Sequence, residues 1–492
     1  MYKRQLLHSE SVGEKPPKAN WVFGVLGIVI LAAAYYISVT IEQPVAALGW
    51  FFIAVLMVIA ATYLLFIAGS VLLCRILQKN KRYYYKPNHF VSVSSMAYRM
   101  KRNGAGLASV CILITMVLVM IASTSCLYFG KNDVLRSQYP HDFNVTVDFD
   151  TLDEVTQENI DKTKAAIDAF MDKNGGISFG ICGKSDRVTG ELRDGVFYMG
   201  DDVYDPEHST FLYIIDLADY NRNTGSSYRL NDGEALVFAS SRTYDHDTVR
   251  IEGGREYKVV KSEGTIDFIR DTDMLGFSAV YIVVPDFYSS AEDLLQATEK
   301  QGVSQPWLQW RYQFDSPADH DKQVKITSEL FSAASEITAE TASDGFGLGS
   351  MASARDDFYG SFGGLFFLGI MLSIVFIIAA VLIIYYKQVS EGYEDQSRFE
   401  IMQKVGMTKK DIRKSINSQM LTVFFLPLLF AIVHLGFAFP MINKLLLLFG
   451  LDNLGLLLLT AAISALVFAL FYIIVYRVTS NAYYSIVSGA KE

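Results

Sequence analysis

Long stretches without a charged side chain dominate the hydropathy pattern of this sequence. Such stretches, free of Asp, Glu, Lys and Arg, occupy residues 19–41, 43–74, 103–130, 358–386, 415–443 and 453–476. An apolar helix of about 20 residues is long enough to cross the ~30 Å hydrocarbon layer of a membrane. Each stretch exceeds that length, so the pattern predicts six membrane-spanning helices and excludes a wholly soluble protein.

Residues 131–357, between the third and fourth stretches, carry the shorter patterns of a mixed α/β domain. Thr151 and Glu154 have the spacing of a capping box and predict a helix. Further helices are expected after Ser290 and over about 317–341. Runs rich in branched and aromatic residues predict strands at 211–215, 235–239 and 279–284. The expected fold class is an α-helical polytopic membrane protein with one large α/β domain between the third and fourth spans.

Glycine occupies every second position from 345 to 349, where the α/β domain approaches the fourth span. Glycine-rich segments are typical of flexible linkers. We therefore expect Gly345, Gly347 and Gly349 to form a flexible joint between the domain and the membrane.

Charge divides the chain into two kinds of segment. Residues 131–357 hold 42 of the 52 acidic residues and 21 of the 43 basic ones, a net charge of −21. Most remaining bases lie in 1–20, 75–102, 387–414 and 477–492. Because short loops rich in Lys and Arg stay cytoplasmic, we expect a cell-membrane protein with both termini in the cytoplasm and an extracytoplasmic α/β domain.

The expected organisation follows from these boundaries. It comprises a cytoplasmic leader (1–20), a hairpin of the first two spans (21–74), a basic cytoplasmic elbow (75–102), the third span (103–130), the α/β domain (131–357), the fourth span (358–386), a charged cytoplasmic connection (387–416), a hairpin of the last two spans (417–476) and a cytoplasmic tail (477–492).

Three segments of the α/β domain come close to catalytic or metal-binding motifs. They are Gly183-Lys184-Ser185 for a nucleotide loop, Asp219-x-Asn221-x-Asn223 for a calcium loop, and Asp245-His246-Asp247 for a metal site. The first lacks its leading glycine and the second its turn glycine and closing carboxylate, so a plain turn and a polar loop are favoured. Three adjacent residues cannot all face one ion. We expect no catalytic residue, metal site or cofactor in this chain, and no nucleic-acid partner.

His434 lies within the fifth apolar stretch. An ionisable side chain inside a membrane is a functional candidate by default. The alternative, favoured here, is a neutral hydrogen-bonded group near the outer interface.

The connection 387–416 is longer than a simple turn requires. Residues 394–405 should form a helix that ends at Gly406, and Thr408 caps the helix that follows. The helix carries an apolar stripe of Phe399, Met402 and Val405, flanked by Arg398, Glu400 and Lys404. Such a stripe suits a groove on a cytosolic partner; alternatively, it lies flat on the inner leaflet.

The same connection carries a family resemblance. Arg398, Phe399, Glu400 and Ile401, followed by Gly406 and Ile412, resemble the R-x-E-I … G-x-x-x-x-x-I pattern of FtsX-like ABC permeases. The longer strings 391–406 and 86–103 are similar to the bacitracin-resistance (Bce-type) branch. The resemblance extends over essentially the whole chain from Trp21.

The resemblance implies a permease subunit that pairs with a separate cytosolic ABC ATP-binding subunit, which holds ATP and Mg²⁺. The residues that would receive the movement of that ATPase are Arg398, Phe399, Glu400, Ile401, Met402, Lys404, Val405 and Gly406. The α/β domain would engage an antimicrobial peptide or its lipid-linked target, and a membrane histidine kinase would associate. The alternative is a mechanotransmission subunit that activates a cell-wall hydrolase or a sensor kinase without transport.

Bce-type permeases have ten membrane helices, and this sequence resembles the fifth to the tenth. Three explanations follow from that difference. Two copies associate, a companion supplies the first permease half, or the chain is a truncated permease with a misplaced start at Met1, which is the explanation that we favour.

Overall fold

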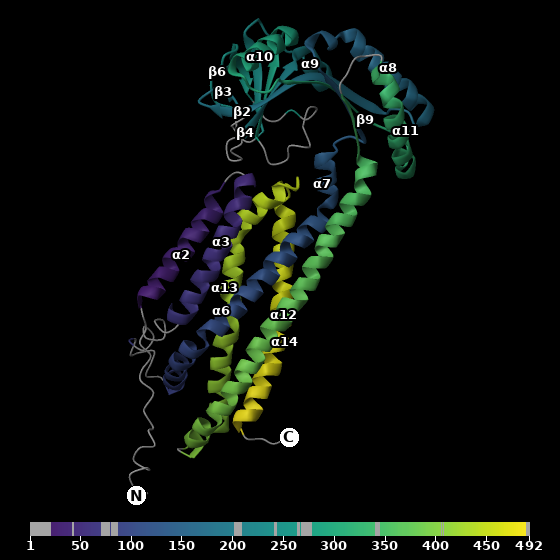
Figure 1. Cartoon of the computed structure of the whole chain (residues 1–492). Coiled ribbons are helices and arrows are strands. Elements are labelled where there is room, and N and C mark those ends of the chain that lie inside the picture. The colour runs from purple at the N-terminus through teal and green to yellow at the C-terminus, as the bar shows by residue number, and fades with distance from the viewer. Residues whose placement is uncertain are drawn as a thin grey trace.

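A computed structural model of the chain describes residues 21–41, 44–69, 79, 87–200, 209–240, 244–262, 266, 278–339, 345–404, 406 and 408–488. The molecule is elongated, with a helix bundle at one end and an α/β domain at the other (Figure 1). We refer to the end of the bundle farthest from the α/β domain as the distal end.

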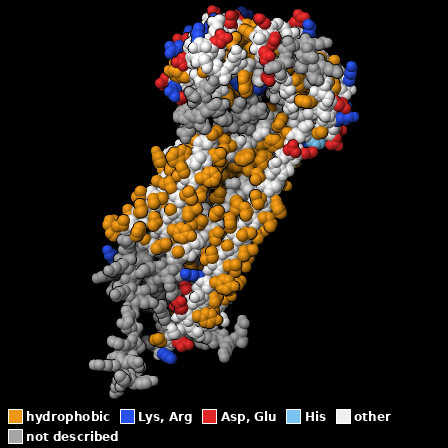
Figure 2. Space-filling model, viewed as in Figure 1, with side chains coloured by type: hydrophobic (Ala, Val, Ile, Leu, Met, Phe, Trp, Pro, Cys, Tyr) orange, Lys and Arg blue, Asp and Glu red, His pale blue; other side chains and the backbone are white. Residues whose placement is uncertain are grey.

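The bundle confirms the predicted membrane-spanning helices. The helices are α2 (Trp21–Thr40), α3 (Pro44–Leu64), α6 (Pro87–Phe129), α12 (Met351–Lys404), α13 (Lys409–Leu447) and α14 (Leu454–Ser488), with a π-helical turn, η1 (Leu65–Gly69), after α3. Six helices of the described part are long and apolar enough to cross a membrane. Figure 2 shows hydrophobic side chains covering the visible side of the bundle, as a lipid environment requires.

Helix α6 packs against α12, α13 and α14 in the centre of the bundle. Its buried residues Ile114 and Leu118 share one core with Phe424 of α13 and Tyr472 of α14. Small residues bring the helices close together, as is typical in membranes. A Cβ atom added to Gly369 of α12 would lie only 2.5 Å from Oγ1 of Thr124 on α6.

The α/β domain contains ten described strands and several helices. The strands are β1 (Phe143–Phe149), β2 (Phe179–Arg193), β3 (Val196–Met199), β4 (Ser209–Asp216), β5 (Glu234–Ala239), β6 (Thr248–Ile251), β7 (Glu256–Ser262), β8 (Ser278–Val284), β9 (Trp307–Asp315) and β10 (Gly345–Ser350). The helices are α7 (Lys131–Gln138), η2 (Leu152–Glu154), α8 (Gln157–Asn174), α9 (Leu217–Thr224), α10 (Phe287–Gln301) and α11 (His320–Ala339).

The strands form one sheet in the order β10-β1-β9-β2-β3-β6-β7-β5-β8-β4, and β4 also pairs with β2. The predicted strands at 211–215, 235–239 and 279–284 are confirmed as parts of β4, β5 and β8, which are adjacent. Their branched and aromatic residues are buried on both faces of the sheet. One face packs against α8, α10 and α11, and the other packs against α9.

Two local predictions are wrong. The glycine-rich joint is a strand, because Gly345–Ser350 pairs antiparallel with β1, with Phe346 and Leu348 packed on the domain core. The capping box of Thr151 and Glu154 is present, but it caps the 3₁₀ turn η2. The α-helix that follows begins at Gln157 and is capped by the side chain of Thr156.

Helix α7 connects the bundle to β1 and is fixed to the loop between α13 and α14. The Ser137 hydroxyl donates to the Gly450 carbonyl at 2.8 Å, and the Asn453 amide donates to Asp133 at 2.9 Å. These bonds anchor the start of the α/β domain to a second part of the bundle.

Candidate functional site

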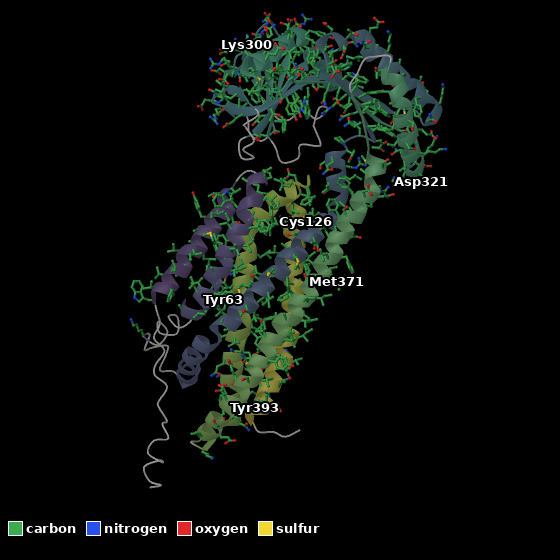
Figure 3. All side chains as sticks on the ribbon, viewed as in Figure 1. Tyr63, Cys126, Lys300, Asp321, Met371 and Tyr393 are labelled. Atoms are coloured by element: carbon green, nitrogen blue, oxygen red, sulfur yellow. The ribbon has the colours of Figure 1, made fainter. Side chains whose placement is uncertain are left out.

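The distal end of α12 has two different faces. Its buried residues are Gln388, Glu391, Gly392, Asp395 and Phe399, and its exposed residues include Tyr393, Glu400, Ile401 and Lys404. Tyr393, labelled in Figure 3, is 65% exposed and Ile401 is 61% exposed. Residues three, four and seven apart share one side of a helix. One side of α12 therefore lies in the bundle, and the other presents two large apolar side chains between charged ones.

Phe399 lies on the buried face. It is 4% exposed and shares the bundle core with Ile416 and Tyr483. The sequence interpretation that placed Phe399 in a partner-facing stripe is therefore wrong, because its ring packs inside the protein. Ile401 carries the apolar surface instead. Val405 and the side chains of Arg398 and Met402 lie outside the described residues, so the rest of the stripe remains a prediction.

The separate helix expected over 394–405 is the last part of α12, which continues unbroken from Met351 to Lys404. Gly406 follows with a φ of 105°, a left-handed conformation that favours glycine. Helix α13 then begins at Lys409. The short turn between the two helices brings Glu400 and Lys404 to the distal surface of the molecule.

His434 is hydrogen-bonded, as expected, but it does not lie near an interface. It is buried near the midpoint of the candidate span Gln419–Leu447. The Thr62 hydroxyl donates to the Val58 carbonyl at 2.6 Å, so its oxygen accepts from Nε2 of His434 at 3.1 Å. Nδ1 then accepts a bond from the Tyr35 hydroxyl at 2.6 Å. Every polar atom of the imidazole is thus used to join α13 to the α2–α3 hairpin.

The near-motifs of the α/β domain form structural contacts. Gly183, Lys184 and Ser185 lie within β2 and not in a turn, and Asp219 lies on α9 and not in a loop. Nζ of Lys184 is 2.8 Å from Asp216 and 3.7 Å from Asp219. Burial alone lowers the pKa of Lys184, but the two carboxylates outweigh it and the pKa is raised. No group of three metal-binding side chains occurs among the residues that the structure describes.

Asp186 is the most unusual ionisable group of the domain. It is 1% exposed, and the backbone N–H of Arg187 is too poorly placed to form a regular hydrogen bond with either carboxylate oxygen. Its strand neighbours Ile214 and Leu308 are buried in the domain core. Burial raises the pKa of Asp186 to about 8. Burial in this core therefore favours the neutral form of the carboxyl group.

Comparison with known proteins finds a family match in the C-terminal part of the bundle. The FtsX-like permease C-terminal family matches residues 370–487, which include the distal end of α12, the turn, α13 and most of α14. This chain contains an FtsX-like permease domain. The exposed residues Tyr393, Glu400, Ile401 and Lys404 of α12 thus lie within the segment that the family matches.

Bacitracin export permeases are among the proteins to which this chain is similar. BceB of Bacillus subtilis (strain 168) is 19% identical over 429 residues, which cover 85% of this chain and 62% of that relative. BceB of Halalkalibacterium halodurans is 22% identical over 448 residues, which cover 87% of this chain and 64% of the relative. The ABC transporter permease protein YxdM of Bacillus subtilis is 21% identical over 431 residues. The chain is therefore homologous to Bce-type proteins, and it spans less than two thirds of the length of these BceB relatives.

Proposed function

We propose that the chain is a permease subunit of an ABC transporter that couples a cytosolic ATP-binding subunit to the α/β domain. In this proposal the distal end of the bundle and both termini are cytoplasmic, and the α/β domain is extracytoplasmic. The partner subunit would hold ATP and Mg²⁺. The two-faced end of α12 is the observation that supports the proposal.

The exposed face of α12 has the chemistry of a docking surface. Tyr393 and Ile401 are eight positions apart and present apolar surface to solvent, while Glu400 and Lys404 lie beside them. Apolar anchors framed by charges are typical of a helix that binds in a groove. We therefore assign ATPase docking to Tyr393, Glu400, Ile401 and Lys404, and not to the buried Phe399.

The length of α12 supports direct transmission of movement. Its 54 residues extend about 80 Å at 1.5 Å per residue. The helix continues directly from β10, so one unbroken element connects the docking face with the sheet of the α/β domain (Figure 1). A displacement at the distal end would therefore reach the α/β domain without passing through a flexible segment.

The ligand of the α/β domain is proposed from charge and from the relatives. The domain carries a net charge of −21, which attracts cationic molecules. Two relatives are bacitracin export permeases. We propose that the domain engages an antimicrobial peptide or its lipid-linked target, and that a second permease half or a second copy completes the transporter. A membrane histidine kinase would receive the signal.

A second function also follows from the continuous helix. A rigid connection serves equally well to activate a cell-wall hydrolase or a sensor kinase without transport. Binding of fluorescently labelled bacitracin to the full-length protein in nanodiscs distinguishes the two functions. Saturable binding supports the peptide-engaging transporter, whereas recovery of the ATP-binding subunit without peptide binding supports the mechanotransmission subunit.

The docking role is tested by purifying the tagged permease from its native membranes and quantifying the ATP-binding subunit that accompanies it. Ile401→Asp and Tyr393→Asp place a charge on the apolar anchors and should reduce recovery about tenfold or more. Asn417→Asp, at an exposed position on α13, is the matched control and should leave recovery unchanged. Equal recovery with Ile401→Asp and with the wild type would reject the docking face.

A further inference from the structure

Helix α14 continues well past its apolar stretch. Its last charge-free run ends at residue 476, but the helix extends to Ser488. The additional residues are about three helical turns, or roughly 18 Å. They lie at the distal end, beside the ends of α12 and α13 (Figure 1). A segment with the composition of a terminal tail is thus part of the packed structure.

Tyr483 connects this end of α14 to α12. Its hydroxyl donates to Oδ2 of Asp395 at 2.6 Å, and the bond is buried. The ring of Tyr483 is 1% exposed and packs beside Gly392, one turn before Asp395. A hydrogen bond to a carboxylate is stronger than one between neutral groups, and exclusion of water strengthens it further. Asp395 lies on the buried face of α12, about 120° around the helix from the exposed Ile401.

Tyr484 connects the same end of α14 to α13. The guanidinium of Arg413 lies 5.3 Å from the centre of the Tyr484 ring, within the range of a cation–π contact. Consecutive residues of a helix point about 100° apart. Tyr483 and Tyr484 therefore reach different neighbours, one before and one after the turn at Gly406.

We propose that Tyr483 and Tyr484 are positioning residues that hold both sides of the α12–α13 turn to α14. This inference rests on the proposed function, because the turn belongs to the site to which we assign the ATPase. With both contacts in place, the exposed face of α12 keeps a fixed position relative to α13 and α14. Movement received at Ile401 is then passed to α14 as well as to α12.

Removal of the Tyr483 hydroxyl distinguishes a positioning role from simple packing. Phenylalanine would fill the same volume but would leave Asp395 without this donor. Asparagine at position 395 retains an oxygen that accepts from Tyr483, whereas leucine retains only comparable volume. If the bond transmits movement, Tyr483→Phe and Asp395→Leu should lower ATP hydrolysis by the same amount. Asp395→Asn should hydrolyse ATP at a rate close to that of the wild type.

The experiment uses the full chain, purified with its ATP-binding subunit and reconstituted in nanodiscs. Two quantities are measured for each variant: the amount of ATPase recovered, and the ATP hydrolysed per recovered ATPase. Tyr386→Phe, which removes the hydroxyl of an exposed tyrosine of α12 outside the docking face, is the control. We expect normal recovery throughout, with hydrolysis per ATPase lowered about three- to tenfold by Tyr483→Phe and Asp395→Leu, as loss of one hydrogen bond predicts. The double variant should be no worse than either single variant.

Three outcomes are distinguishable. Absence of any ATPase with the wild-type protein overturns the proposed function itself. Normal recovery and normal hydrolysis in Tyr483→Phe overturn the positioning role and leave the docking face intact. A parallel fall in recovery and thermal stability, with unchanged hydrolysis per recovered ATPase, assigns Tyr483 to packing alone and also overturns the inference.

Discussion

The hydroxyl of Tyr35 lies 2.6 Å from Nδ1 of His434 near the middle of the bundle. The Tyr35 ring also stacks on Phe437, with 3.8 Å between ring centres. One turn along α2, the Ser38 hydroxyl donates to the Phe437 carbonyl at 2.6 Å. These contacts attach the α2–α3 hairpin to α13 through polar groups that lipid cannot satisfy.

Loss of the Tyr35–His434 bond should loosen the hairpin. Tyr35→Phe and His434→Leu should each destabilise the protein, with a coupling energy of about 0.6–2 kcal/mol in a double-mutant cycle. Unfolding in mixed micelles of increasing SDS content provides the measurement. Tyr36→Phe, which alters an exposed tyrosine of the same helix, should have no effect. Strictly additive losses would show that the two side chains do not interact.

The close crossing of α6 and α12 should not tolerate a larger residue. Gly369→Val places a branched side chain where an added Cβ atom alone would lie 2.5 Å from Thr124 Oγ1. We expect a loss of about 1–3 kcal/mol, typical of overpacking, measured as a lower thermal unfolding midpoint in nanodiscs. A Cβ atom on Gly364 would meet nothing within 4 Å, so Gly364→Ala should be neutral. A Gly369→Val variant as stable as the wild type would contradict the helix contact.

Asp186 should make the α/β domain sensitive to pH. Its folded pKa of about 8 lies above the ordinary value of about 3.9. The stabilisation from the bound proton is therefore fully present below about pH 4 and is lost as the pH rises through 8. Asp186→Asn mimics the neutral acid and should make stability nearly independent of pH in this range, with a gain on the order of a few kcal/mol at pH 9.

Hydrogen exchange of β2 in the full-length protein at pH 5, 7 and 9 checks this prediction. The wild type should exchange relatively faster at pH 9, after correction for intrinsic rates, and Asp186→Asn should not. Asp245→Asn, at an exposed position, serves as the control. The same pH profile for Asp186→Asn and for the wild type would exclude Asp186 as the source.

The strand assignment of Gly345–Ser350 predicts slow exchange where a flexible linker would exchange freely. Amides that bond to β1 should be protected, whereas residues 245–247, which are exposed and lie in neither helix nor strand, should exchange quickly. Exchange mass spectrometry on the full chain can compare both peptides. Equal rates in the two segments would restore the interpretation as a flexible joint.

Long apolar segments made most of the bundle predictable. A helix that crosses lipid must be apolar along its whole length, so composition alone identifies it. The strands β4, β5 and β8 were predictable for a similar reason, because they are buried on both faces. Strand β2 was not, because it contains the buried Lys184, Asp186 and Arg187. The ion-pair partners of Lys184 lie on another strand and a helix, which local hydropathy cannot reveal.

The sequence predicted where the candidate site lies along the chain, but it did not predict which side of the helix faces solvent. The three-residue spacing of Phe399, Met402 and Val405 predicts an apolar stripe without specifying what covers it. Tyr483, which lies 88 residues after Asp395 and shares the core with Phe399, determines the buried side. Likewise, the glycines of β10 alternate with core residues, and Gly345 would clash with Asp148 if it carried a Cβ atom. At Gly345 the absence of a side chain leaves room for the Asp148 carboxylate, and the segment is a paired strand and not a flexible joint.

The chain passes between the bundle and the α/β domain along two neighbouring paths. Helix α6 leads through α7 into β1, and β10 leads directly into α12, with β1 and β10 paired and α6 packed on α12. Both paths enter at the same margin of the sheet, since β10 and β1 are its first two strands. Axial sliding of α12 against α6 therefore acts on a single pivot. The domain would tilt as one rigid body, with its largest excursion near β7 and β5, because β4 pairs back with β2 and keeps β8 closer to the pivot.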